Sequence, residues 1–214
     1  MASTSAWNAE LGIWEGARAA FDKDLELPDP LYIFGYGSLC WKADFAYEHC
    51  WVGSIRGWHR RFAQRSTDHR GTPDCPGLVV TLLTDEELAE LQPMQAEATS
   101  PCFGVCYKVG KRDEAAVLDA LDFREKGGYT RAVVEVLSPE GETVRALLYT
   151  ANPSNPHFYL PAPEEAARII ATAVGPSGAN VDYLLNLAAW LERNKLEDAH
   201  VEELRRLLPR QGDR

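Results

Sequence analysis

The sequence predicts one mixed α+β domain, and three observations lead to this fold class. The chain has 214 residues, 45% of them hydrophobic, which is enough for one substantial core and short for two. Amphipathic helix patterns share the chain with strand patterns, and neither a repeat nor a boundary divides it. The strand patterns cover residues 31–34, 51–55, 78–83, 103–109, 132–137 and 144–150.

Helices are predicted where apolar residues recur every three or four positions. Trp7, Leu11, Trp14, Ala17 and Phe21 have this spacing, so we expect a helix over residues 7–21 in an N-terminal extension, 1–30. The single domain is expected over 31–208, before a frayed tail at 209–214. Its helices are expected at 88–92, behind a capping box that begins at Thr84, at 113–124, from 161 to Gly175, after Gly178, and at 196–208.

Charge and apolar content exclude several classes of protein. The formal net charge of −10 disfavours a nucleic-acid partner. The longest apolar stretch, residues 184–191, is too short to span a membrane, and the N-terminus lacks the features of a secretion signal. We therefore expect a soluble, cytoplasmic protein. The sequence does not indicate its oligomeric state.

No motif predicts a cofactor or a metal. The chain lacks a Walker loop, a zinc-protease helix and an EF-hand, and Gly35-Tyr-Gly37 has no third glycine at the dinucleotide spacing. The five histidines are scattered, without helical ligand spacing. The five cysteines are odd in number and are expected to be reduced thiols.

A glycine-flanked turn is the first candidate for chemistry. Phe34-Gly-Tyr-Gly-Ser-Leu39 directly follows a buried strand pattern, and such a turn can present consecutive backbone N–H groups to a carboxylate or an oxyanion. From spacing alone, the alternative is a plain tight turn that packs Tyr36 and Leu39 inside.

Two charged segments are the other candidates. Glu125 lies between a predicted helix end and paired glycines, where the alternative is a solvated charge cluster. Residues 56–70 contain five arginines among aromatic residues, which suggests recognition of a phosphate or a carboxylate. The alternative for this segment is one positive face that balances acidic helices.

Taken in order, these segments resemble the ChaC family of glutathione-specific γ-glutamylcyclotransferases. The resemblance covers about residues 31 to 191, and its longest strings are Phe34-Gly-Tyr-Gly-Ser-Leu39, Ser66-Thr-Asp-His-Arg-Gly71, Leu121-Asp-Phe-Arg-Glu-Lys-Gly-Gly-Tyr129 and Gly175-Pro-Ser-Gly178. The chain differs from the family pattern before residue 31, at 85–101 and at 155–160. The last difference leaves open whether Phe158 or Tyr159 faces the pocket.

The resemblance implies a γ-glutamylcyclotransferase-like fold, in which helices flank a barrel-like mixed sheet. It implies cleavage of glutathione to 5-oxoproline and Cys-Gly, with Glu125 as the catalytic acid and base and no cofactor or metal. The implied substrate-binding residues are Gly35, Tyr36, Gly37, Ser38, Leu39, Cys40, Arg70, Tyr129 and Tyr183. Two alternatives remain open: a cyclotransferase for other γ-glutamyl amino acids or γ-glutamylamines, and a non-catalytic γ-glutamyl-binding module.

Overall fold

The computed structural model describes residues 6–8, 13–15, 25–92, 100–124 and 129–209. The chain divides into two compact units, and each unit combines two stretches that are far apart in the sequence. The first unit is Met1–His59 with Leu82–Pro156, and the second is Arg60–Thr81 with His157–Arg214. Because the units interleave, no change in composition marks a boundary. The single domain over 31–208 stays a prediction.

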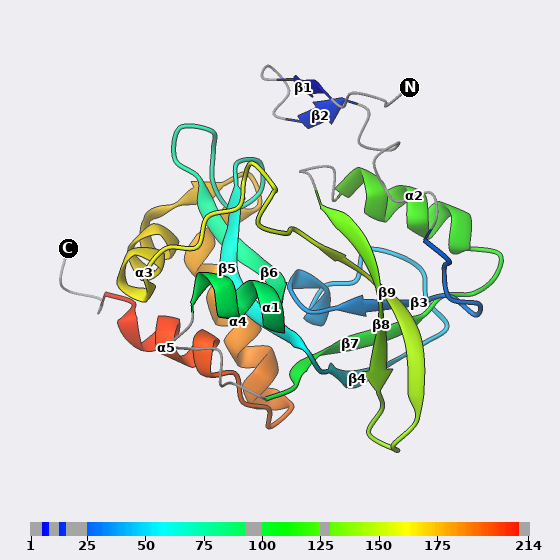
Figure 1. The fold of residues 1–214 in the computed structure, drawn as a ribbon. Coiled ribbons are helices and arrows are strands. Elements are labelled where there is room, and N and C mark those ends of the chain that lie inside the picture. Colours follow the sequence, from blue (N-terminus) through cyan, green and yellow to red (C-terminus); the bar gives the residue numbers. More distant parts are fainter. Residues whose placement is uncertain (1–5, 9–12, 16–24, 93–99, 125–128, 210–214) are drawn as a thin grey trace. The chain divides into compact units, whose positions relative to one another are not determined.

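The first unit contains a mixed β-barrel (Figure 1). Among its described residues, five strands close in the order β3-β7-β4-β8-β9, with β3 parallel to β9. The mixed barrel expected from the resemblance is confirmed, and all five strands were predicted. Their bounds are Tyr32–Gly35 (β3), His49–Ile55 (β4), Cys102–Lys108 (β7), Thr130–Leu137 (β8) and Thr143–Thr150 (β9).

The β8–β9 hairpin fixes a register that matters for the site. Gly141 has a φ of 87°, which favours glycine, and the Ser138 N–H donates to the Glu142 carbonyl at 2.8 Å. The resulting ladder places Arg131 directly opposite Tyr149. Side chains opposite one another on neighbouring strands lie about 5 Å apart at Cβ, so this pair can interact.

Two helices of the first unit match the predicted ones closely. α1 (Asp85–Leu91) begins with the predicted capping box, in which Thr84 and Glu87 bind each other's backbone N–H groups. α2 (Glu114–Arg124) buries Val117 and Leu121, so the stripe that predicted the helix is also the face that packs.

The helix predicted for residues 7–21 is not found in the described part of that segment. Strands β1 (Ala6–Asn8) and β2 (Ile13–Glu15) pair antiparallel there, with Trp7 opposite Trp14. Tryptophan and isoleucine favour strands, whereas Asn8 and Gly12 weaken a helix, so local propensity outweighs the apolar spacing. Residues 9–12 and 16–24 lie outside the described residues, as do 210–214 of the expected tail.

The second unit is mainly helical. α3 (Pro163–Thr172), α4 (Asn180–Arg193) and α5 (Ala199–Leu207) follow the predicted order. Short strands β10 (Val174–Gly175) and β11 (Gly178–Ala179) join α3 to α4. Two longer strands, β5 (Trp58–Ser66) and β6 (Gly77–Thr84), pair with each other, and residues 60–66 and 77–81 of these strands belong to the second unit.

The arginine-rich segment is a strand and not one positive face. Arg60 and Arg61 are only 2% and 7% exposed, whereas Arg65 is exposed. The Arg60 guanidinium donates to the Asp198 carboxylate at 2.5 Å. Burial alone would raise the pKa of Asp198, but the charge of Arg60 holds it below its ordinary value. Ion pairing therefore permits Arg60 in a buried strand, and the charges of the arginines made the strand pattern hard to recognise in the sequence.

Polar side chains also anchor the helices of this unit to its strands. Asn180, which is fully buried, accepts from the Leu78 N–H at 2.6 Å and donates to the Leu78 carbonyl at 2.7 Å. The Phe62 N–H donates to Nε2 of His200 at 3.0 Å, which requires that nitrogen to be unprotonated. The five cysteines all lie within the described residues, where they are not joined in disulfides.

We expect His200 to make the protein less stable in acid. Burial, followed by the charges of Arg61 and Arg60, lowers the pKa of His200 from 6.5 to about 4, although Asp198 opposes this shift. As the pH falls from 6.5 towards 4, the unfolded chain binds a proton that the folded protein does not bind, so stability is lost in that window. The expected loss is about 2 kcal/mol, after allowance for the partial exposure of the ring.

Urea unfolding at pH 7 and pH 4.5 measures this loss. His200→Gln keeps an acceptor for the Phe62 N–H and should lose less stability between the two pH values. His49→Gln, at an exposed histidine, should behave as the wild type. An unchanged pH dependence in His200→Gln would contradict the assignment.

Candidate active site

The glycine turn begins at the end of β3. Gly35 and Tyr36 are buried, and a short 3-10 turn, η2 (Ser38–Cys40), follows with Gly37, Ser38 and Leu39 partly exposed. The N–H of Cys40 donates to the Gly37 carbonyl at 2.9 Å. The first N–H groups of a helical turn have no acceptor within it, so Ser38 and Leu39 can offer theirs to a ligand.

Tyrosine hydroxyls tie this turn to the barrel. The Tyr36 hydroxyl donates to the Tyr149 carbonyl at 2.7 Å, and the Tyr107 hydroxyl donates to the Leu39 carbonyl. Burial, followed by the nearby Cys40 and Cys50, raises the pKa of Tyr107 above its ordinary value, so its hydroxyl remains a donor at neutral pH. The turn is therefore held both just before η2, at Tyr36, and within it, at Leu39.

The end of α2 is tied to the same turn. The Arg124 guanidinium donates to the Ser38 hydroxyl, and its other terminal nitrogen lies 3.8 Å from the Asp44 carboxylate. A cation in the last turn of a helix is also favoured by the helix dipole. The predicted charge cluster is thus not simply solvated, because Arg124 and Asp122 are both engaged in contacts within the first unit.

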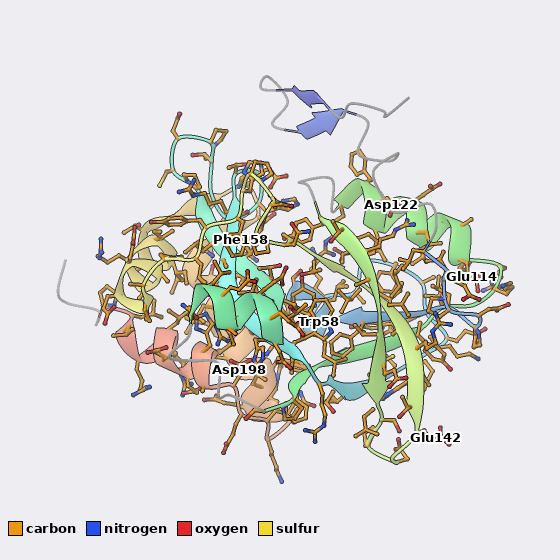
Figure 2. All side chains as sticks on the ribbon, in the orientation of Figure 1. Trp58, Glu114, Asp122, Glu142, Phe158 and Asp198 are labelled. Atoms are coloured by element: carbon orange, nitrogen blue, oxygen red, sulfur yellow. The ribbon has the colours of Figure 1, made fainter. Side chains whose placement is uncertain are left out.

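Asp122 is at the centre of a second contact with the barrel. Its carboxylate accepts two hydrogen bonds from the Arg131 guanidinium and one, at 2.6 Å, from the Tyr149 hydroxyl. Nε of Arg131 also donates to the Tyr149 hydroxyl at 3.2 Å. Figure 2 labels Asp122 on α2, the helix that leads to residue 125.

Glu125, the predicted acid and base, lies outside the described residues. It follows Arg124 in the sequence, and Tyr129, which is partly exposed, precedes β8. The structure therefore describes both flanks of the segment that carries the predicted carboxylate.

Arg70 and Tyr183 belong to the second unit, whereas the other predicted site residues belong to the first. Arg70 donates to the Ala179 carbonyl at 3.1 Å, and its guanidinium lies 5.9 Å from the Tyr183 ring. The Arg70 N–H also donates to the Ser66 hydroxyl at 2.9 Å. These two residues thus form a basic and aromatic pair within their unit. The Tyr159 hydroxyl of the same unit donates to Glu165 at 2.6 Å, and Figure 2 labels its neighbour Phe158.

Sequence reasoning did not assign a role to Asp122, Arg131 or Tyr149. Asp122 stood within a quoted motif, but a carboxylate two positions before a helix end gives no sign of its partner. The hairpin turn at 138–142 is the sequence feature that could have predicted part of this contact. It fixes the strand register, and that register places Arg131 opposite Tyr149.

The described residues show neither a metal cluster nor a membrane-spanning helix. Within them, no group of three or more histidine, cysteine, aspartate or glutamate side chains is placed to hold a metal. In the same ranges, no helix has the length and apolar character that crossing a membrane requires.

The barrel and its turn define the γ-glutamylcyclotransferase fold. The crystal structure of the γ-glutamyl cyclotransferase specific to glutathione from yeast matches with a TM-score of 0.75 and 28% identity, over 86% of this chain and 99% of that one. A family model described as ChaC-like protein matches residues 31–211. The chain belongs to this ChaC-like family.

Relatives with curated names agree with this assignment. Human glutathione-specific γ-glutamylcyclotransferase 1 is 41% identical over 179 residues, which cover 81% of this chain and 75% of the human one. The glutathione-specific γ-glutamylcyclotransferase of Schizosaccharomyces pombe is 36% identical over 191 residues, which cover 85% and 94% of the two chains.

We expect Gly35→Ala to destabilise the turn. A Cβ at residue 35 would lie 2.3 Å from Cβ of Leu39, so the turn itself would have to move. Overpacking of this kind typically costs about 1–3 kcal/mol, which thermal or urea unfolding measures.

Gly110→Ala is the matched control, because the nearest atom to its added Cβ is Oε1 of Glu48, the end of a flexible side chain, at 3.1 Å. Its effect should be clearly smaller. Equal stability changes in both variants would contradict the close approach at Gly35.

Proposed function

We propose that the protein is a γ-glutamylcyclotransferase that converts glutathione to 5-oxoproline and Cys-Gly. The hydrogen bond between Arg124 and Ser38 carries this proposal, because it joins the helix that leads to Glu125 to the glycine turn. The family match supports it, since residues 31–211 include both segments. The names of the human and S. pombe relatives support glutathione as the substrate.

In this reaction the substrate supplies its own nucleophile. The α-amine of the γ-glutamyl group attacks the γ-carbonyl carbon, a C–N bond forms in a five-membered lactam, and the amide bond to cysteine breaks. Well-oriented ring closures have effective molarities of about 10⁵ to 10⁸ M, roughly 7–11 kcal/mol of the barrier. A turn held by Tyr36 and Tyr107 provides the rigid surface on which the chain of the substrate can be folded.

Proton transfer is the task that we assign to Glu125. The substrate amine is mostly an ammonium at neutral pH and cannot attack, so a carboxylate must first accept its proton. The same group then returns this proton to the departing cysteine amine. It also transfers to that amine the second proton that the ring nitrogen loses as the lactam forms, so Cys-Gly leaves as an ammonium and Glu125 is a carboxylate again. General acid and base assistance of this kind is typically worth about 10²- to 10⁴-fold.

The oxyanion that forms on the γ-carbonyl oxygen needs hydrogen-bond donors that stabilise its negative charge. The N–H groups of Ser38 and Leu39, at the start of η2, are the donors that we propose. One well-placed donor typically contributes about 3–4 kcal/mol to the stability of the transition state. Arg70 is positively charged and partly exposed, which suits a substrate carboxylate.

A substrate panel tests the substrate assignment. One relative, 39% identical over 81% of this chain, is named only γ-glutamylcyclotransferase 2-3, from Arabidopsis thaliana. Glutathione, γ-glutamyl amino acids and a γ-glutamylamine should therefore be compared by 5-oxoproline release. Preference for glutathione supports the proposal, and preference for another member favours the broader cyclotransferase. Binding of glutathione without product would favour a binding module.

Glu125→Gln should lower kcat by at least about 10²-fold, because the amide has nearly the same shape but cannot accept and return a proton. Melting temperature and glutathione binding should stay close to those of the wild type. Glu164→Gln, at an acidic residue in the first turn of α3, serves as the control and should keep full activity. An unchanged kcat in Glu125→Gln would remove this residue from the mechanism.

A further inference from the structure

A network of buried polar groups joins the last turn of α2 to the barrel. The side chains of Asp122 and Arg131 are 13% and 14% exposed, and Tyr149 is 7% exposed. Asp122 accepts from both Arg131 and Tyr149, so the charged groups of this network are paired with one another. Arg131 follows Asp122 by 9 residues in the sequence, and Tyr149 follows it by 27.

The network also reaches the glycine turn. Tyr149 donates through its hydroxyl to Asp122 and accepts through its backbone carbonyl from the Tyr36 hydroxyl. Burial, followed by the hydrogen bond with Asp122, raises the pKa of Tyr149 above its ordinary value, so the hydroxyl remains a donor at neutral pH. One residue therefore connects the turn that we assign to the substrate and the helix that leads to Glu125.

The desolvation of its charged groups indicates that this network contributes more to a fixed geometry than to stability. A buried ion pair is weak support for stability, because desolvation offsets most of its attraction. A fully satisfied network does, however, fix one geometry, and α2 has only Val117 and Leu121 buried to hold its position. The three hydrogen bonds on Asp122 therefore add directional contacts that hold the last turn of the helix.

We propose that Asp122, held by Arg131 and Tyr149, is a positioning residue for Glu125. Covalent geometry gives the physical link, because consecutive Cα atoms are about 3.8 Å apart and Glu125 follows Asp122 by three residues. A displacement of about 1 Å at a reacting group can cost 10²-fold in rate. The inference rests on the proposed function, since it needs a carboxylate at 125 that moves protons.

Asp122→Asn tests this role, because it removes the charge and one acceptor oxygen with little change in shape. We expect kcat for glutathione to fall at least about tenfold, while KM changes less than about threefold. Asp198→Asn is the matched control. Asp198 is also 13% exposed and pairs with a buried arginine, and Figure 2 labels both aspartates. The control should lower the melting temperature comparably and keep kcat within about twofold of the wild type.

A double-mutant cycle separates positioning from general stability. If Asp122 acts through Glu125, Asp122→Asn should lower kcat little further once Glu125→Gln is present, so the two effects should not add. Full additivity, or a normal kcat in Asp122→Asn while Glu125→Gln is inactive, would overturn the positioning role and leave the proposed function standing. A normal kcat in Glu125→Gln would overturn both.

Tyr149→Phe provides a second route if Asp122→Asn fails to fold. It removes the two hydrogen bonds that the Tyr149 hydroxyl makes with Asp122 and Arg131 and leaves the Asp122–Arg131 pair in place, and kcat should fall about three- to tenfold. The decrease should again disappear in the Glu125→Gln background. Wild-type kcat in Tyr149→Phe would contradict the proposal.

Discussion

The contact between the end of α2 and the glycine turn is the constraint on which the proposed site depends. Arg124 binds Ser38, and Asp122 binds the strand pair whose backbone also holds Tyr36. Charged groups make these contacts at a helix with little apolar packing, since α2 buries only Val117 and Leu121. Each contact is short and directional, so together they fix the helix end more precisely than its apolar face does.

Barrel closure makes this constraint possible. The parallel pairing of β3 with β9 puts Ile33 opposite Leu147, so the residues that follow these two positions leave the barrel on neighbouring strands. Tyr36 and Tyr149 can then meet although 113 residues separate them. The antiparallel β8–β9 ladder adds Arg131 to Tyr149, and α2 crosses near the open end of this hairpin (Figure 1). The barrel therefore brings β8, β9 and the end of α2 to the turn that follows β3.

Much of the fold could be predicted from the sequence, because apolar periodicity records burial directly. The barrel strands, the capping box at Thr84 and the order of the helices in the second unit follow from local pattern. β5 was missed because Arg60 is buried through an ion pair with Asp198, which lies 138 residues away and which no window of β5 contains. At residues 7–21 the helical spacing was misleading, since β-favouring residues can produce the same spacing by chance.

The candidate site, like the fold, has one part that the sequence predicts and another that depends on the three-dimensional structure. Motif strings predict a role for the turn and for Glu125, because these strings consist of consecutive residues. The roles of Asp122, Arg131 and Tyr149 depend on strand register and helix position, which are properties of the fold. A network of this kind becomes visible only when side chains from separate segments are placed together.

The proposed function requires that the α-amine of the substrate, and not water, attacks the γ-carbonyl. Turnover of glutathione in ¹⁸O-labelled water, followed by mass spectrometry, tests it most directly. Intramolecular attack predicts 5-oxoproline without ¹⁸O and an equal amount of Cys-Gly. Glutamate that contains ¹⁸O, or labelled 5-oxoproline, would show that water attacks first and would contradict the account.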